Sequence, residues 1–256
     1  MESLHKSFIS GCHILHYHRI LDAYGHLSVR HPTRNDVFLM CRSMAPATVS
    51  SRLDIIEYYI EDASPVDPGS PLGYVERFIH SEIYKRYSDV QSIIHSHSPD
   101  VVPYSISGVP LQPCVHLAGF LGKKVPNFDI LDFYETGDVR DLLIRNRQLG
   151  KQLASYFSSN SGGLTEAVVL MRGHGFTVVG GSIEECVFRA IYTSENARIQ
   201  SSALALSTAH PLATDIKYIH ETEIPASTAM TQWSYMRPWK LWVQEVEATS
   251  LYTNLA

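Results

Sequence analysis

Two histidines separated by one residue, His95 and His97, have the clearest potential for chemistry in this sequence. They end the apolar run Ser92-Ile93-Ile94, which is typical of a buried strand. On a strand, residues i and i+2 point to the same face, so two imidazoles at this spacing can hold one divalent ion. Histidines that are hydrogen-bonded inside a core give the same pattern, and the pair alone leaves both interpretations open.

A third histidine, His174, follows the apolar segment 167–171 and lies between Gly173 and Gly175. Glycines allow close approach of backbone or ligand because they carry no Cβ. A simple β-turn has the same composition, but three imidazoles with an open position are typical of a catalytic zinc site. We therefore expect His95, His97 and His174 to bind Zn²⁺, with Mn²⁺, Fe²⁺ or Co²⁺ as alternatives that fit the same donors.

A carboxylate is expected to complete this site. Glu76 lies at the start of a predicted helix over residues 74–87, just upstream of the histidine pair. It is a candidate ligand or general acid/base, although a glutamate in a first helical turn also interacts favourably with the helix dipole. Glu82 is instead expected to be solvated and paired with Lys85 or Arg86.

Periodicity predicts the elements that position these residues. Helices are expected at 2–22, 74–87, 138–157 and 182–207, the last capped by Ser182 with Glu185 at the capping-box position. Strands are expected in a hairpin over 27–40 and at 55–60, 90–97, 167–171 and 176–179. This order predicts one α/β domain over residues 1–213 and a C-terminal extension over 214–256. The extension is expected to pack on the domain or on a neighbouring subunit, and its aromatic residues are expected to pack between subunits rather than to form a substrate box.

Composition excludes several function classes. The chain has 256 residues with 21 Lys and Arg against 26 Asp and Glu, a net charge of −5 that argues against a nucleic-acid partner. No apolar run reaches the roughly 18 residues of a membrane span, and no signal peptide is recognisable. The four cysteines are far apart and form no CxxC pair. A reduced, cytoplasmic protein without a membrane or nucleic-acid partner is expected.

Together these features resemble the class II aldolase/adducin family. The resemblance rests on an acidic residue at a helix start, an HxH pair 19 residues later (Glu76 to His95), an LxRxHG-like turn and a long helix after it. The stretch Gly25–Arg30 matches the family pattern G-N-x-S-x-R with His26 in place of the asparagine. The resemblance implies an α/β/α sandwich around a central, mainly antiparallel sheet and a homo-oligomer, with a tetramer favoured. It also implies that the three histidines are metal ligands and that Glu76 is a resting-state ligand and acid/base.

Departures from the family pattern bear on the substrate. The sugar-phosphate aldolases of the family have two serines before the glutamate and an asparagine that contacts the phosphate, whereas this chain has Tyr74, Val75 and His26. A bulky tyrosine and an apolar valine do not replace two small donors in a phosphate cradle. Stretches such as GHLSVRHP, RSMAP and HSHSPDVVPYS instead resemble a branch of decarboxylases that act on ring-cleavage products of aromatic acids, relatives of 2-hydroxy-3-carboxymuconic semialdehyde decarboxylase.

The expected activity is that of a carbon–carbon lyase. A divalent ion stabilises the enolate that forms when a bond next to a carbonyl breaks, and the leaving fragment is CO₂ or an aldehyde. We expect His26, Arg30, Arg42 and Ser43 to bind a small carboxylic acid, although each arginine also suits a surface ion pair. His116 is expected to reprotonate the enolate, with a hydrogen-bonded core histidine as the alternative.

Decarboxylation of an aromatic-derived or unsaturated hydroxy or oxo acid is the leading hypothesis. The alternatives are an aldolase, dehydratase or epimerase of a small non-phosphorylated hydroxycarbonyl, and a non-catalytic adducin-like binding module. The third alternative conflicts with the three histidines, which adducin-type heads lack.

Overall fold

The computed structural model describes residues 1–158, 164–210 and 215–256. Its centre is a seven-stranded sheet in the order β3-β2-β1-β4-β7-β6-β5. The strands are β1 (His26–Arg30), β2 (Val37–Cys41), β3 (Ile55–Tyr59), β4 (Ser92–Ser96), β5 (Asn127–Phe128), β6 (Val168–Met171) and β7 (Gly175–Gly180). All neighbouring strands are antiparallel except β5 and β6, which are parallel. The expected mainly antiparallel sheet is confirmed.

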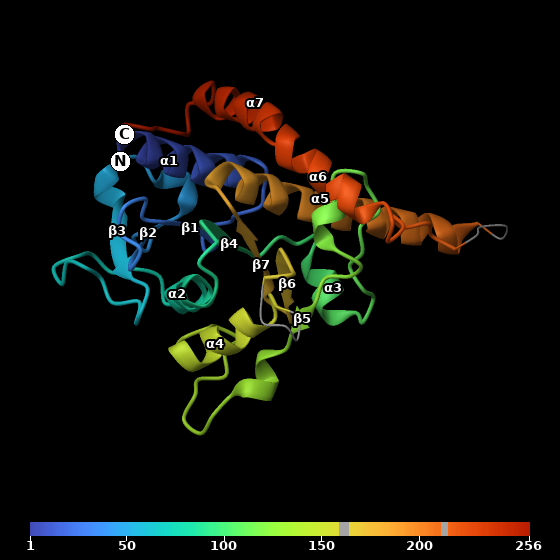
Figure 1. Ribbon diagram of the computed structural model, residues 1–256, viewed down its shortest axis with the longest axis horizontal. Coiled ribbons are helices and arrows are strands. Elements are labelled where there is room, and N and C mark those ends of the chain that lie inside the picture. The colour runs from blue at the N-terminus through green and yellow to red at the C-terminus, as the bar shows by residue number, and fades with distance from the viewer. Residues whose placement is uncertain (159–163, 211–214) are drawn as a thin grey trace.

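Helices cover both faces of this sheet, as expected for an α/β/α sandwich. They are α1 (Glu2–Tyr17), α2 (Arg77–Arg86), α3 (Val102–Ile106), α4 (Arg147–Ser155), α5 (Ile183–Ala209), α6 (Ile224–Ser234) and α7 (Met236–Glu247). The α1 and α5 helices pack against each other on one side, with α7 outside them, whereas α2 and α4 pack together on the other side (Figure 1). No helix within residues 1–158, 164–210 and 215–256 is long and apolar enough to cross a membrane.

Strand β4 is the central element for function. It lies between β1 and β7, and its residues are fully buried. In its register His95 lies opposite His26 of β1 on one side and opposite Thr177 of β7 on the other. Because side chains alternate along a strand, these three residues share the sheet face that carries α2. The end of β4 therefore brings polar groups from three strands together.

The segment 138–157 differs from the expected single helix, since only α4 at its C-terminal end is helical. Leu142 has a φ of 69°, a left-handed conformation that interrupts an α-helix, and Asn146 caps α4 by accepting from the Leu149 N–H. The non-helical part contributes the backbone N–H of Ile144, which donates to Glu76 Oε1.

The long helix α5 begins as expected at Ser182, whose Oγ accepts from the Glu185 N–H at 3.1 Å. The reciprocal bond of the predicted capping box is displaced by one residue, because Glu185 Oε2 accepts from the N–H of Gly181 rather than from Ser182. The turn that leads into the helix is thus fixed together with its first residues.

The C-terminal segment packs on the same chain. Trp239 and Trp242 of α7 are buried, and the Trp242 ring lies 5.1 Å from the ring of His18. The expectation that the tail aromatics pack between subunits is therefore wrong for these two, because α7 lies along α1 and α5 of its own chain. Trp233, 71% exposed, is free of this packing. The expected boundary at residues 213 and 214 lies outside the described residues.

Candidate metal centre

His95 and His97 project to one face at the end of β4, as their spacing predicts. Their Nε2 atoms are 3.0 Å apart, and the ring of His95 is fully buried. His95 belongs to the strand, whereas His97 is the residue after its last member, Ser96. The central strand therefore fixes both rings from one short stretch of backbone.

His174 reaches this pair from the turn between β6 and β7. Its Nε2 lies 3.3 Å from Nε2 of His95. Gly175 makes the approach possible, because a Cβ at this position would lie 2.0 Å from the backbone oxygen of Ser96. Gly173 has a φ of 64°, which favours glycine. The two glycines around His174 thus allow the turn to close against the end of β4.

Glu76 is the residue directly before α2, and one of its carboxyl oxygens lies at the same cluster. Its Oε2 is 3.5 Å from Nε2 of His174 and 3.7 Å from Nε2 of His95. Its Oε1 accepts a hydrogen bond from the N–H of Ile144 at 2.9 Å, which orients the carboxyl group. Burial raises the pKa of Glu76 to about 7, and the bond from Ile144 opposes that rise.

The four side chains fit a divalent cation. One ligand atom from each of Glu76, His95, His97 and His174 lies within 4.8 Å of the others. Zinc binds imidazole nitrogen at about 2.0–2.1 Å, so tetrahedral ligands are about 3.3 Å apart. The observed separations of 3.0 Å and 3.3 Å between imidazole nitrogens are close to this value. Three neutral nitrogens and one carboxylate oxygen are a donor set that divalent transition ions accept.

The surroundings keep the imidazoles of His95 and His174 neutral. Burial, together with the neighbouring His97, lowers the pKa of His174 to about 4. Burial and the adjacent imidazoles hold the pKa of His95 well below its usual range. A neutral imidazole has the lone pair that a metal ion requires. His95 and His174 therefore present their nitrogens as ligands at neutral pH.

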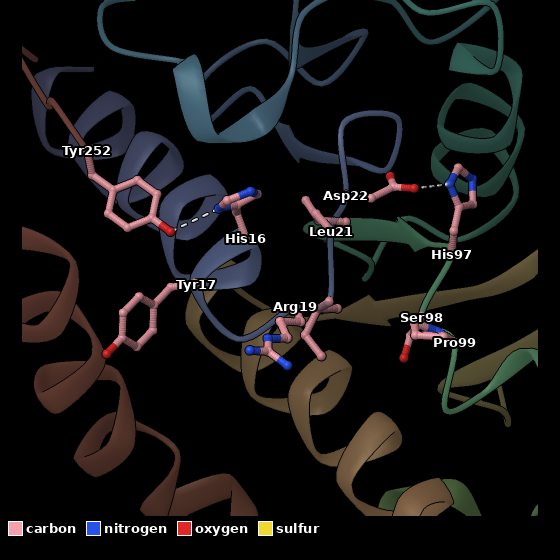
Figure 2. A pocket seen from close by; sticks show the side chains of 10 residues that line it. His16, Tyr17, Arg19, Leu21, Asp22, His97, Ser98, Pro99 and Tyr252 are labelled. Atoms are coloured by element: carbon pink, nitrogen blue, oxygen red, sulfur yellow. Dashed lines mark hydrogen bonds and ion pairs between the residues drawn. The ribbon is translucent and has the colours of Figure 1, made fainter. Parts of the chain in front are cut away.

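Asp22 supports His97 from behind. Its Oδ2 lies 3.3 Å from Nδ1 of His97, and Figure 2 shows the two groups pointing toward each other. The Oδ1 atom of Asp22 accepts from the backbone N–H groups of Tyr24 and Gly25. A carboxylate that accepts the Nδ1 proton leaves the lone pair on Nε2, the atom that faces the cluster.

A cavity of about 430 Å³ lies beside this Asp22–His97 pair (Figure 2). Its lining includes the side chains of Tyr17, Arg19 and Tyr252. Of the four clustered residues, only His97 lines it, so the cavity lies behind the cluster and not in front of it.

His26 lies next to the cluster. Its ring centroid is 5.1 Å from that of His95 and 4.8 Å from that of Tyr74. The Tyr74 hydroxyl donates to the backbone oxygen of Met44, which holds the ring against the segment after β2. His26 is the one expected substrate-binding residue that the structure places in contact with the expected metal ligands.

Arg30, by contrast, is turned away from the cluster. It lies at the far end of β1, and its guanidinium donates to the backbone oxygens of Tyr84, Tyr87 and Val90. These carbonyls lie at and after the C-terminal end of α2, whereas Glu76 lies at its N-terminal end. The guanidinium of Arg30 therefore ties β1 to the end of α2, and its substrate-binding role stays a prediction that the geometry of this chain does not support.

Arg42 and Ser43 lie near Tyr74 rather than at the cluster itself. Arg42 forms a bridge with Gly73, and its guanidinium is paired with Asp54 at 3.0 Å. The Ser43 N–H donates to the backbone oxygen of Leu72. The Arg42 side chain is therefore partly exposed and already paired with Asp54.

His116 is exposed and is not brought to the cluster within one chain. Its backbone oxygen accepts from Ser227 Oγ of α6.

Two residues next to the site are not among those expected from the sequence. Asp22 lies beside His97, and His80 lies beside His26. His80 follows Glu76 by four residues and is therefore on the same helix face, which is the sequence signal that indicates it.

Residues 7–201 match the Class II Aldolase and Adducin N-terminal domain. The chain is 58% identical to decarboxylase tropJ of Talaromyces stipitatus, over 98% of this chain and 97% of that protein. It is 26% identical to a 3,4-dihydroxyphthalate decarboxylase of Arthrobacter keyseri over 70% of each chain.

The fold is also found among solved structures. The L-fuculose 1-phosphate aldolase of Glaciozyma antarctica superposes with a TM-score of 0.70 at 20% identity, over 96% of this chain and 89% of that chain. At this identity the likeness concerns the fold alone.

Proposed function

The chain belongs to the class II aldolase and adducin family, and on that premise we propose that it is a divalent-metal-dependent decarboxylase of an aromatic-derived or unsaturated hydroxy or oxo acid. A lyase that breaks a carbon–carbon bond is the broader function, supported by the full-length relationship to a decarboxylase. Metal dependence rests on one observation, the convergence of Glu76, His95, His97 and His174 within 4.8 Å.

Decarboxylation sets clear requirements for such a site. The bond between the carboxyl carbon and its neighbour breaks, the electron pair stays on the neighbour, CO₂ leaves and the neighbour takes up a proton. A divalent ion held by the cluster would supply Lewis acidity to the oxygens of the acid. The protein must orient the acid and supply one proton.

Glu76 is the residue proposed to supply that proton. Its Oε2 faces the cluster, while Oε1 is held by the Ile144 N–H, so the proton would be transferred at Oε2. Its burial favours the protonated form in the absence of other charges. The same oxygen is a candidate ligand in the resting state. The acid would displace it from the ion, and the freed carboxylate would then take up, from the hydroxyl group of the acid or from solvent, the proton that it later donates.

The remaining expected site residues are proposed to act on the substrate around the cluster. His26, adjacent to His95, is proposed to bind an oxygen of the substrate. Arg42 and Ser43 are proposed to line its approach near Tyr74. His116 is the alternative donor of that proton; in this role it would reach the site of a neighbouring subunit, since it lies outside the cluster of its own chain.

Activity with defined acids tests this proposal. Metal-free protein, reloaded with Zn²⁺ or Mn²⁺, is incubated with 3,4-dihydroxyphthalate and with 2-hydroxy-3-carboxymuconate-type acids, and CO₂ is measured. We expect metal-dependent CO₂ release from one of them. The first acid is chosen because the Arthrobacter keyseri relative carries its name. Release of an aldehyde instead of CO₂ would favour an aldolase acting on a non-phosphorylated hydroxycarbonyl.

Metal content separates these enzymes from a binding module. A protein that holds no zinc or manganese, either as purified or after loading, would favour a non-catalytic adducin-like role. We further propose a cytoplasmic homo-oligomer, and light scattering of the purified protein measures whether it is a tetramer.

A further inference from the structure

Four buried polar side chains form an unbroken hydrogen-bond chain that ends beside the cluster. Nδ1 of His26 lies 2.8 Å from Nε2 of His80, and Nδ1 of His80 lies 2.6 Å from Oγ of Ser28. The Ser28 Oγ in turn lies 2.8 Å from the hydroxyl of Tyr84. Each of the four residues is at most 2% exposed. No expected site function uses His80, Ser28 or Tyr84.

The secondary structure explains why these residues meet. Glu76, His80 and Tyr84 follow one another at intervals of four residues and therefore form one stripe along α2. His26 and Ser28 are two residues apart on β1 and therefore share one sheet face. Phe38, itself fully buried, packs against the rings of His80 and Tyr84. The stripe that begins at Glu76 thus continues into the interior.

The distances favour one direction of the hydrogen bonds over the other. The Tyr84 hydroxyl has two acceptors within reach, Ser28 Oγ at 2.8 Å and the backbone oxygen of Gln91 at 3.5 Å. The Gln91 oxygen also accepts from the Arg30 N–H at 2.8 Å. An O–H···O bond is normally 2.7–2.8 Å long, so the phenol proton points to Ser28.

The positions of the remaining protons follow from the bond between Tyr84 and Ser28. Ser28 has a single proton, and because it accepts from Tyr84 it donates to Nδ1 of His80. Burial lowers the pKa of His80 to about 3, so the ring is neutral and its one proton is on Nε2. That proton is donated to Nδ1 of His26. The neutral ring of His26 then carries its own proton on Nε2.

We infer that the chain Tyr84–Ser28–His80 fixes His26 as a hydrogen-bond donor at Nε2, which makes His26 a substrate-binding donor and His80 its positioning residue. An imidazole with one nitrogen protonated and the other accepting a bond has no lone pair for a metal. This accounts for why His26, although its ring is 5.1 Å from that of His95, would not become a fourth imidazole ligand. The ligand class is an anionic or carbonyl oxygen, such as that of a hydroxy acid.

The substrate part of this inference rests on the proposed function, but the tautomer does not. In metal-free protein with ¹⁵N-labelled histidine, NMR reports which ring nitrogen carries the proton, and His26→Asn assigns the signals. We expect the Nε2–H form for His26 and for His80. A His26 proton on Nδ1 would overturn the inference whether or not any acid is decarboxylated.

Variants within the chain test its direction. Tyr84→Phe keeps the ring but removes the hydroxyl that orients Ser28, so we expect the His26 signals to shift toward a mixture of tautomers. Tyr87→Phe is the matched control, because Tyr87 donates a buried hydroxyl to the backbone oxygen of Ala154 outside the chain. Unchanged His26 signals in Tyr84→Phe, or equal shifts in both variants, would contradict the assignment.

Ligand binding tests the positioning role. His80→Leu removes the donor to His26, and we expect KM for the acid to rise ten- to a hundredfold, the range for loss of a hydrogen bond to a charged group. His80→Gln restores an amide N–H and should recover most of this loss. Bound metal per chain is measured in both variants and should equal that of the wild type. A fall in kcat alone, or metal loss that parallels the activity, would assign His80 a purely structural role.

Discussion

Asp22 Oδ2 lies 3.3 Å from Nδ1 of His97, on the side of the ring opposite the Nε2 atom that faces His95. Asp22 is itself fixed by the N–H groups of Tyr24 and Gly25. The carboxylate therefore sets both the tautomer and the orientation of one expected metal ligand.

Replacing Asp22 is expected to weaken metal binding without removing a ligand. Outer carboxylates behind metal-bound histidines contribute about 10- to 100-fold to affinity. We predict a loss at the lower end for Asp22→Asn and at the upper end for Asp22→Ala, measured by competition with a chromophoric chelator. Asp36→Asn, a change at an exposed acid whose Oδ1 is 3.9 Å from Arg34, controls for the loss of surface charge. Equal affinity in wild type and Asp22→Ala would exclude this role.

The cluster of Glu76 and the three histidines could be predicted because it depends on short-range sequence patterns. The one-residue separation of His95 and His97 places both rings on one face of any strand. The glycines around His174 indicate a close approach, and a Cβ at Gly175 would indeed overlap the backbone oxygen of Ser96. Glu76 was expected at a helix start, and it lies immediately before α2.

Other roles depend on tertiary partners that no local pattern contains. The guanidinium of Arg30 is held by three carbonyls around the end of α2, and only the folded chain brings these atoms together. The Ile144 N–H that orients Glu76 belongs to a stretch whose helical periodicity is overridden by the left-handed Leu142. Asp22 is distant in sequence from His97 and has no motif of its own.

Loss of a single imidazole is expected to remove most of the metal bound by the cluster. His95→Ala or His174→Ala removes one of three nitrogens, so we predict that most bound metal and nearly all activity are lost. His5→Ala is the control, since His5 lies on α1 and outside the cluster. Elemental analysis of dialysed protein gives the metal content per chain, and full occupancy in His174→Ala would exclude it as a ligand.

Glu76→Gln is expected to separate folding from turnover. The amide is nearly isosteric and still offers an oxygen to the Ile144 N–H, but it cannot transfer a proton. We predict a far-UV circular dichroism spectrum and a Tm close to those of the wild type, with kcat reduced at least about 100-fold, the lower bound for general acid–base catalysis. Turnover at the wild-type rate would contradict the role proposed for Glu76.

Arg30→Met is expected to affect stability more than substrate binding. It removes hydrogen bonds from a charged group to the Tyr84, Tyr87 and Val90 carbonyls, of which a single one contributes about 1.5–3 kcal/mol. Partial exposure weakens these bonds, so we predict a loss of about 2 kcal/mol in the free energy of unfolding by urea. KM at a temperature where the variant is folded should stay within threefold of the wild type. A larger rise in KM with unchanged stability would return Arg30 to the substrate site.

Acid is expected to destabilise the metal-free protein in part through His80. Its pKa is about 3 in the folded chain because of burial, against about 6.5 when unfolded. The unfolded chain therefore binds the proton first, so the contribution of His80 is fully present above pH 6.5 and is lost as the pH falls toward 3. Between neutral pH and pH 5 this loss amounts to about 2 kcal/mol. His80→Gln lacks the titrating group, so its free energy of unfolding, measured in urea at each pH with chelator present, should fall less steeply than that of the wild type. Parallel curves over this interval would mean that His80 titrates in the same way in both states, and the neutral hydrogen-bond chain to His26 would then be incorrect.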